Sequence, residues 1–233
     1  MNKKWKITAI SDTHNKHKQF DGFVPGGDIL LHAGDMTGRG YKKELENFFK
    51  WYDNINNYDH KFFIAGNHDF GFQDNPEEIK GILTGYKTID YLQDELVMLG
   101  EGDYIDMVKI WGTPWQPEFH NWAFNLPRGE KIKEKWDMIP QNTDILLVHG
   151  PPHGKLDYVP YSNENVGCEE MMKKIKEIKP KIVVFGHIHE SFGYVFDGDT
   201  HYINAAVLDG RYIFKNKPVT FEWDPITNEL NFM

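Results

Sequence analysis

The segment KIVVFGHIHE, residues 181–190, combines a short apolar run with two histidines one residue apart. The run IVVF (182–185) is typical of a strand that is covered on both faces. Gly186 interrupts the run, and His187 and His189 follow directly. Because alternate residues of an extended chain point to the same side, we expect the two imidazoles to stand together just past the end of this strand.

Four other apolar runs have the same design, a short strand followed by a turn rich in Asp, His, Asn and Gly. They are ITAI before SDTHN (7–15), DILLHA before GDM (28–36), KFFIA before GNHD (61–69) and DILLV before HGPP (144–152). Helical patterns lie between several of these runs, in YKKELENFFKWY (41–52), RGEKIKEKWDMI (128–139) and CEEMMKKIKEIK (168–179). Strands that alternate with helices predict an α/β fold in which these runs form a largely parallel sheet.

The remaining segments are aromatic, partly alternating and separated by Gly/Asp turns, as in antiparallel hairpins. They cover residues 88–99, 103–112, 191–208 and 218–225. A second, mixed or antiparallel sheet packed on the first is therefore expected. The predicted fold class is α/β, a two-sheet β-sandwich flanked by helices. Since we find no repeat, low-complexity segment or linker, we expect a single domain over residues 1–233.

Composition restricts the possible functions. The formal net charge of −9 argues against a binder of long nucleic acids, which needs basic surfaces, but a small phosphate substrate stays possible because bound metal ions would reverse the local charge. Cys168 is the one cysteine of the sequence, so an intrachain disulfide is excluded and a reducing, cytoplasmic location is expected. No apolar stretch approaches the roughly 18 residues that a membrane span needs. The apolar stretch within the first ten residues is too short for a signal peptide. The sequence does not indicate an oligomeric state.

Side chains able to bind metal follow all five apolar runs. They are Asp12, His14, Asp35, Asn67, His68, His149, His187 and His189. One histidine after a strand is usually just hydrogen-bonded, but five such turns at the carboxyl ends of strands indicate a shared site. Without a thiolate, a closed structural zinc site is disfavoured, whereas carboxylate, imidazole and amide ligands suit Mn²⁺, Fe²⁺ or Zn²⁺ in an open site. Two ions about 3.5 Å apart would use this many ligands and suit displacement at phosphorus.

The order of these motifs resembles that of the calcineurin-like metallophosphoesterase superfamily: D-x-H (12–14), G-D (34–35), G-N-H-D (66–69), H-G (149–150) and G-H-x-H (186–189). The resemblance implies a two-sheet sandwich with two divalent ions, Mn²⁺ or iron first and Zn²⁺ as an alternative. It implies that the first ion is held by Asp12, His14, Asp35 and His189, and that Asp35 bridges to a second ion held with Asn67, His149 and His187. It places His68 beside the substrate phosphate or the leaving group.

Residues 111–129 and 149–157 are further similar to the metallophosphoesterase domain-containing (brain-expressed) branch, which is associated with phosphodiester hydrolysis, including that of 2′,3′-cyclic nucleotides. Some members of that branch carry Gly at the position of His187 and are weak enzymes, so His187 favours a competent site. The resulting hypothesis is a dinuclear phosphodiesterase in which a metal-bridging hydroxide attacks phosphorus and His68 stabilises the transition state or protonates the leaving alkoxide. A phosphomonoesterase of broad specificity and, outside enzymes, a protein-binding scaffold are the alternatives, and a nuclease ranks lower.

One motif departs from the related phosphoprotein phosphatases, which carry G-D-x-x-D-R-G. The present sequence is GDMTGRG (34–40), with Gly38 in place of the second Asp, which in those enzymes supports the histidine of G-N-H. We therefore predict that support for His68 from this position is absent and that phosphoprotein phosphatase activity is disfavoured. Arg39 is retained and is a candidate phosphate contact.

The remaining candidates are assigned with their simpler alternatives. His153 and Asn204 are candidate substrate contacts, His32 is expected to be a hydrogen-bonded buried histidine rather than a ligand, and Asp69 is expected to orient its loop or a ligand. Surface positions are expected for His17, His60 and His120. The aromatic segment 111–127 either packs on itself over one end of the sheets or forms a wall that stacks on a nucleobase or aryl group, and both can hold.

Overall fold

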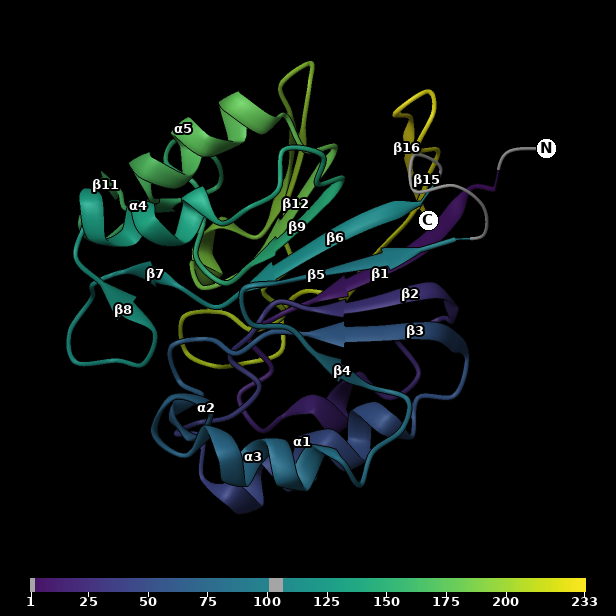
Figure 1. Cartoon of the computed structure of the whole chain (residues 1–233). Coiled ribbons are helices and arrows are strands. Elements are labelled where there is room, and N and C mark those ends of the chain that lie inside the picture. Colours follow the sequence, from purple (N-terminus) through teal and green to yellow (C-terminus); the bar gives the residue numbers. More distant parts are fainter. Residues whose placement is uncertain (1–2, 101–106) are drawn as a thin grey trace.

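The computed structural model describes residues 3–100 and 107–233, and it shows two six-stranded sheets packed face to face. Helices cover the outer face of each sheet, which gives four layers (Figure 1). The predicted fold class, a two-sheet sandwich flanked by helices, is confirmed. Within the described residues, no helix is long and apolar enough to cross a membrane.

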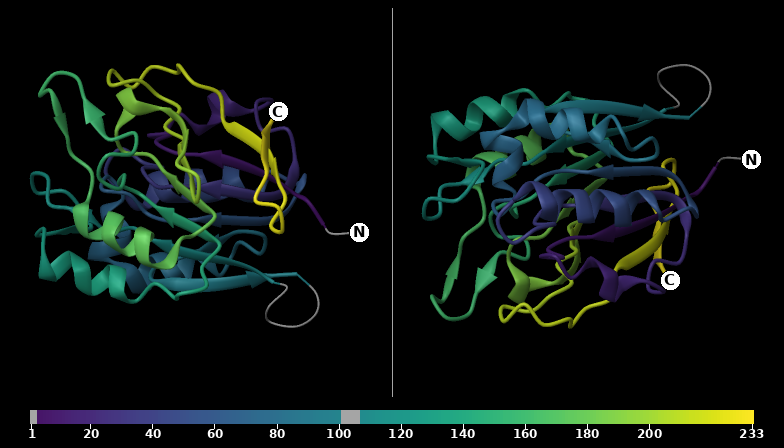
Figure 2. Two further views of the ribbon diagram at one scale, coloured as in Figure 1. Left: turned by 90° about the horizontal axis from the view of Figure 1, so that it is seen from above. Right: turned by 90° about the horizontal axis from the view of Figure 1, so that it is seen from below.

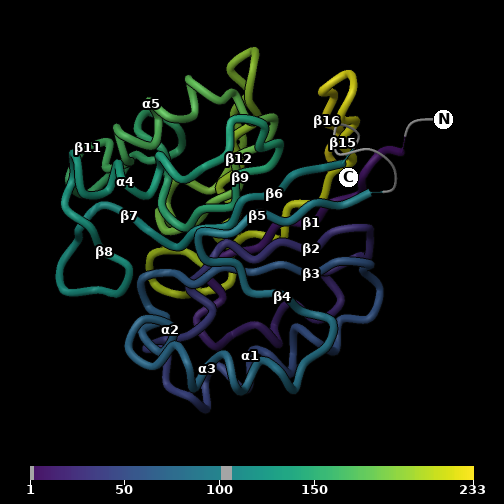
Figure 3. Tube along the Cα trace, in the orientation of Figure 1, coloured from purple at the N-terminus to yellow at the C-terminus, as the bar shows by residue number. Residues whose placement is uncertain are grey.

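The first sheet has the strand order β16-β15-β1-β2-β3-β4. Its strands are β1 (Trp5–Ile10), β2 (Gly27–His32), β3 (Tyr58–Phe63), β4 (Asp90–Tyr91), β15 (Val219–Trp223) and β16 (Leu230–Phe232). Strands β1 to β4 run parallel, whereas β15 is antiparallel to β1, with Trp5 opposite Trp223. The pairing of β1 with β15 places the two ends of the chain side by side in one sheet (Figure 3).

The second sheet has the order β13-β14-β12-β9-β6-β5. Its strands are β5 (Glu95–Leu99), β6 (Val108–Thr113), β9 (Ile145–Val148), β12 (Ile182–Phe185), β13 (Gly193–Phe196) and β14 (His201–Asn204). The inner four strands are parallel, and the two edge strands are antiparallel to their neighbours. Every residue of β9 and β12 is buried, as their continuous apolar sequences predicted.

Three apolar layers hold the sandwich together. One lies between the sheets and includes Ile7, Ile110 and Val184. A second joins the first sheet to helices α1 (Lys42–Asp53), α2 (Phe70–Asp74) and α3 (Pro76–Leu83), and a third joins the second sheet to α4 (Glu130–Asp137) and α5 (Glu169–Ile178). The three predicted helices are thus confirmed to within two residues at each end. Cys168 and Ile175 lie in the third layer, on the buried face expected for α5.

Two details of the predicted architecture were wrong. The five apolar runs do not share one sheet, because β1, β2 and β3 belong to the first and β9 and β12 to the second. Residues 88–99 do not form a hairpin, since β4 pairs with β3 and β5 pairs with β6. Part of the segment 103–112 lies outside the described residues. Hydrophobic periodicity identifies a strand, but it carries no information about the strand's partner.

Short elements surround the carboxyl ends of the parallel strands, on the side away from the chain termini (Figure 2). They are the 3₁₀ turn η3 (His189–Ser191) and the paired strands β7 (Gln116–Pro117) with β8 (Asn125–Leu126) and β10 (Tyr158–Val159) with β11 (Glu164–Asn165). These segments form the rim of the candidate site described below, whereas the 3₁₀ turn η1 (His17–Phe20) packs against α1.

Candidate metal centre

Loops from both sheets bring the predicted ligands together at this end of the sandwich. Among the described residues, three groups of potential ligands occur, and within each group the ligand atoms lie within 4.8 Å of one another: Asp12 with His14 and His189, His14 with Asp35 and His68, and Asp35 with His149 and His187. Because His14 and Asp35 each belong to two groups, the three groups form one connected cluster. The cluster spans the boundary between the sheets, so neither sheet could build it alone.

Left-handed backbone turns direct these side chains. The φ angles of Asp12, His14, Asp35 and His187 are 57°, 39°, 54° and 67°, a region that non-glycine residues rarely adopt. The expectation that His187 and His189 lie side by side on an extended chain was therefore wrong. The turn at His187 separates the two rings: His187 lies against His149 with ring centroids 5.1 Å apart, and His189 Nε2 lies 3.2 Å from Asp12 Oδ1.

Two glycines are required by close approach. A Cβ on Gly66 would lie 2.3 Å from Asp35 Oδ1, and a Cβ on Gly186 would lie 2.0 Å from Asp12 Oδ2. The glycines of the G-N-H-D and G-H-x-H motifs therefore make room for the two carboxylates, which are both almost completely buried.

Asp35 lies at the middle of the cluster. Its carboxylate oxygens are 3.5 Å from His149 Nε2, 3.6 Å from His14 Nε2 and 3.9 Å from His68 Nε2. The backbone N–H of His68 donates to Asp35 Oδ1 at 2.8 Å. The amide Oδ1 of Asn67 lies 3.0 Å from His149 Nε2, so this predicted ligand faces the same space.

Four histidines of the cluster present the same ring nitrogen to the centre. The Nδ1 atoms of His14, His68, His149 and His189 lie 2.8–3.1 Å from the backbone carbonyl oxygens of Thr37, Gly38, Ala33 and Asp209, respectively. Since a carbonyl oxygen only accepts, each Nδ1 carries the hydrogen and donates it. Each Nε2 is thereby aimed at the carboxylates, which is the arrangement that orients imidazole ligands for metals.

The electrostatics of the cluster suit a cation. Burial would raise the pKa of Asp35, yet the neighbouring His149 holds it well below its usual value, and His189 does the same for Asp12. Burial opposes protonation of His149, but Asp35 raises the pKa of that imidazole to about 9. His14 Nε2 is buried without a hydrogen-bond partner. Two buried carboxylates and an unpartnered imidazole nitrogen fit divalent ions, and with no thiolate in the set they favour ions that accept oxygen and nitrogen ligands.

Support for His68 does come from the position of Gly38, contrary to the prediction. The backbone carbonyl oxygen of Gly38 lies 2.9 Å from His68 Nδ1 and takes the place of the missing carboxylate. The loop that carries Gly38 is in turn fixed by Asp69, whose oxygens accept hydrogen bonds from the Thr37 N–H and Oγ1 and from the Gly66 N–H. Asp69 therefore orients both loops, one of the two roles predicted for it, and burial raises its pKa to about 7.

The three predicted substrate contacts lie outside this cluster. Arg39 is exposed, and its guanidinium packs over Phe70 at 4.5 Å. His153 is exposed and its Nδ1 lies 3.6 Å from Asp157. The buried amide Nδ2 of Asn204 donates to the carbonyl oxygen of Ile188 at 2.9 Å, so this side chain holds the G-H-x-H turn in place.

Of the histidines without a predicted role at the site, one was expected to be buried and three were expected at the surface. His32 is buried and bonded to Thr13 Oγ1 at 3.1 Å, as expected for a hydrogen-bonded histidine. The surface position expected for His17 was wrong, because His17 is buried against Trp51 and Phe48. His120 is exposed, as predicted, and His60 is partly buried. The sequence does not predict which side chain of η1 reaches the core, because so short a turn has no repeating apolar pattern.

A cavity of about 530 Å³ opens above the cluster. Besides cluster residues, its walls include Phe119 and Trp122 from the loop between β7 and β8, Tyr161 between β10 and β11, and Tyr212 after β14. Part of the aromatic segment packs into the core, where Phe124 is buried, while Phe119 and Trp122 line the cavity, where the predicted wall would stand. Tyr212, whose ring lies edge-on to His14 at 4.7 Å, was not predicted, because no motif marks it.

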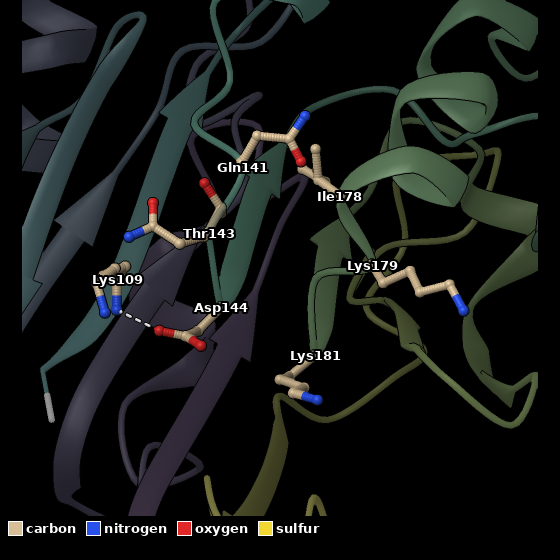
Figure 4. A pocket seen from close by; sticks show the side chains of 8 residues that line it. Lys109, Gln141, Thr143, Asp144, Ile178, Lys179 and Lys181 are labelled. Atoms are coloured by element: carbon tan, nitrogen blue, oxygen red, sulfur yellow. Dashed lines mark hydrogen bonds between the residues drawn. The ribbon is translucent and has the colours of Figure 1, made fainter. Parts of the chain in front are cut away.

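A second cavity, of about 440 Å³, lies at the opposite ends of the strands (Figure 4). It is lined by Lys109, Gln141, Asn142, Thr143, Asp144, Ile178, Lys179 and Lys181. The N–H of Lys109 donates to Asp144 at 2.9 Å, and Lys179, which extends away from Asp144, pairs with Asp199 at 3.0 Å. Among residues 3–100 and 107–233, no group of potential metal ligands lies at this second cavity.

Comparison with known proteins agrees with this geometry. The family model of calcineurin-like phosphoesterases matches residues 6–191. Human metallophosphoesterase domain-containing protein 1 is 37% identical over 242 residues, which cover 93% of this chain and 70% of that protein. A UPF0046 protein of Caenorhabditis elegans is 36% identical, over 93% of this chain and 59% of its own length. The crystal structure of TT1561 of Thermus thermophilus superposes with a TM-score of 0.66 at 15% identity, over 99% of both chains, and so shares the fold.

Proposed function

The chain belongs to the calcineurin-like phosphoesterase family, and from this premise we propose that it is a metal-dependent phosphodiesterase acting on small phosphodiesters such as 2′,3′-cyclic nucleotides. The observation that carries the proposal is the connected cluster around Asp35, in which four imidazole Nε2 atoms and two buried carboxylates converge at the foot of an open cavity. By contrast, both ring nitrogens of the buried His32 are hydrogen-bonded, to Thr13 and to Gly34.

In the proposed centre, the residues around Asp35 would hold two divalent ions, and Asp35 would be a ligand to both. One would be held with Asp12, His14 and His189, and the other with Asn67, His149 and His187. When bound, such ions neutralise the phosphoryl oxygens and lower the pKa of a water, which makes it a nucleophile at neutral pH. The ligand chemistry favours Mn²⁺ or iron, with Zn²⁺ as an alternative.

His68 is the proposed proton donor. Its Nδ1 is engaged with Gly38, so Nε2 is the atom that can hold a transferable proton. As the bond between phosphorus and the leaving oxygen breaks, that proton passes to the oxygen, and the imidazole is left neutral until it takes a proton from solvent. The aromatic side chains of the cavity offer surfaces on which a nucleobase or aryl group can stack.

Metal analysis and substrate comparison test the proposal together. The purified protein should contain Mn, Fe or Zn by elemental analysis. In Mn²⁺ it should hydrolyse bis-p-nitrophenyl phosphate and 2′,3′-cyclic AMP faster than p-nitrophenyl phosphate. Faster hydrolysis of the monoester would replace the proposal by a phosphomonoesterase. A protein that binds no metal and hydrolyses none of the three would instead be the protein-binding scaffold.

The proposed ligand is a small phosphate ester, with no long nucleic acid and no membrane as partner. The net charge of −9 supports the exclusion of long nucleic acids. We also propose a cytoplasmic location, which is supported by the absence from the sequence of a second cysteine that could form an intrachain disulfide with Cys168.

A further inference from the structure

We infer that Trp122 is a positioning residue for His68, and that Arg39 acts through Trp122 rather than on the substrate. The indole of Trp122 stacks on the imidazole of His68, with ring centroids 4.1 Å apart and planes 27° apart. On another side, His14 meets the same imidazole edge-on, at 4.6 Å and 81°. The ring of His68 is therefore confined by two aromatic neighbours.

Trp122 is itself held relative to His68. The backbone N–H of Ala123, the next residue, donates to the carbonyl oxygen of Asn67 at 3.0 Å, and Asn67 directly precedes His68. The guanidinium of Arg39 lies 5.2 Å from the centre of the indole and 4.5 Å from that of Phe70, within reach of a cation–π contact to each ring. Phe70 and Trp122 also touch, with ring centroids 5.9 Å apart.

The packing by Trp122 adds a restraint on the ring of His68 that the residue at position 38 cannot provide, because Gly38 has no carboxylate. A single hydrogen bond from His68 Nδ1 to the neutral Gly38 carbonyl, at 2.9 Å, fixes one atom of the ring but permits the ring to tilt about that bond. Stacking by Trp122 restricts the tilt and so keeps Nε2 on the Asp35 side, 3.9 Å from Oδ2. Because Trp122 also lines the cavity, the restraint acts beside the space that a leaving group would occupy.

The inference rests on the proposed function and makes a distinct chemical prediction. Proton transfer from Nε2 matters most when the departing oxygen is a strongly basic alkoxide, and little when it is p-nitrophenolate, which leaves without protonation. Loosening His68 should therefore slow cleavage of 2′,3′-cyclic AMP much more than cleavage of bis-p-nitrophenyl phosphate. A loss of general stability or of metal would slow both reactions alike.

The test compares kcat for these two substrates in wild type, Trp122→Leu, Trp122→Phe and Arg39→Gln, each with its metal content measured. We expect Trp122→Leu to lower kcat for the cyclic nucleotide by about 10- to 100-fold, a part of the contribution of a general acid, and that for the aryl diester by only a few fold. Trp122→Phe keeps a stacking ring and should recover most of the loss. Arg39→Gln should also lower kcat more for the cyclic nucleotide than for the aryl diester, but by a smaller factor than Trp122→Leu.

His120→Ala is the control, because His120 lies on the same loop between β7 and β8 but is exposed, does not line the cavity, and its ring contacts Phe119 rather than His68. Whatever this variant does to KM, the ratio of the two kcat values should stay at the wild-type value. Equal losses on both substrates in Trp122→Leu and Trp122→Phe, or no loss at all, would overturn the inference while leaving the proposed function intact. If the wild-type protein hydrolyses neither substrate, the proposed function fails and the inference falls with it.

Discussion

The two cavities at opposite ends of the strands are similar in size, about 530 and 440 Å³, but they differ in how their charges are satisfied. At the carboxyl ends, two buried carboxylates face imidazole nitrogens, and His14 Nε2 has no hydrogen-bond partner. At the opposite end, Lys109 and Asp144 are joined and Lys179 is paired with Asp199. Both ends contain charged side chains, but only the first concentrates buried ligand atoms that an ion would satisfy.

The difference shows that volume and charge alone do not identify a site. A buried polar atom that lacks a partner costs free energy in the folded protein, and where such an atom lies beside buried carboxylates, as His14 Nε2 does, a cation would complete the group. The left-handed turns at Asp12, Asp35 and His187 add to the same cost.

Replacing the central carboxylate, Asp35, should abolish the metal binding that we expect at one cavity and not at the other. Asp35→Asn keeps the size of the side chain but removes the charge that three histidines face. We expect loss of bound metal and a fall in diester hydrolysis beyond the roughly 100-fold seen when a partner of a metal ligand is removed. Elemental analysis and a bis-p-nitrophenyl phosphate assay measure both. Wild-type turnover with full metal content would contradict the two-ion centre.

Removing the proposed proton donor should separate binding from chemistry. His68→Ala should retain its metal and lose about 10²- to 10⁴-fold in turnover of 2′,3′-cyclic AMP, the usual contribution of a general acid. His60→Ala, a partly buried histidine on β3, is the control and should resemble wild type. Loss of metal from His68→Ala would show that His68 is a ligand instead.

Removal of metal should lower the stability of the folded protein, because the ion that stabilises it binds at the cluster around Asp35. An ion that binds only the folded protein stabilises it by about 2.7 kcal/mol at 100 times its Kd, so adding Mn²⁺ to chelator-treated protein should raise Tm. The same titration on Asp35→Asn should give little or no shift. An equal shift in both proteins would place the stabilising ion elsewhere.

A buried histidine outside the cluster should behave in the opposite way to His149. Burial against aromatic rings lowers the pKa of His17 to about 4, below the value near 6.5 expected in the unfolded chain. The unfolded state therefore binds more protons between these values, and the contribution of His17 to stability, complete above pH 6.5, is lost as the pH falls toward 4. His17→Phe should remove roughly 1–2 kcal/mol of the destabilisation seen at pH 5. Urea unfolding of both proteins at pH 7.5 and 5 measures it, and an unchanged difference would refute the shift.

The smallest effect is expected at the opposite cavity. Lys181→Ala should leave metal content and turnover within about twofold of wild type and change stability by no more than about 0.5 kcal/mol, as for most surface substitutions. The same assays serve for the comparison with Asp35→Asn. A large loss of turnover would mean that the two ends are coupled.

Much of the candidate site could be predicted because its residues occur in short motifs placed after apolar runs. Each run is recognisable from local hydrophobicity, and the direction of a parallel strand determines the end at which its motif lies. The three helices were predictable for the same local reason. The role of Gly38 was not, since the atom that supports His68 is a backbone carbonyl oxygen, which every residue type carries.

Tertiary structure decided what depends on distant partners. The sequence by itself determined the ligand types, the strand ends that carry them and the apolar faces of the helices, because these follow from residue identity and spacing. Only the folded chain decided that β1 to β3 and β9 with β12 lie in different sheets, that Trp122 stacks on His68, and that His17 is buried. These contacts join residues from different parts of the chain, so their energies appear only when these distant segments pack together.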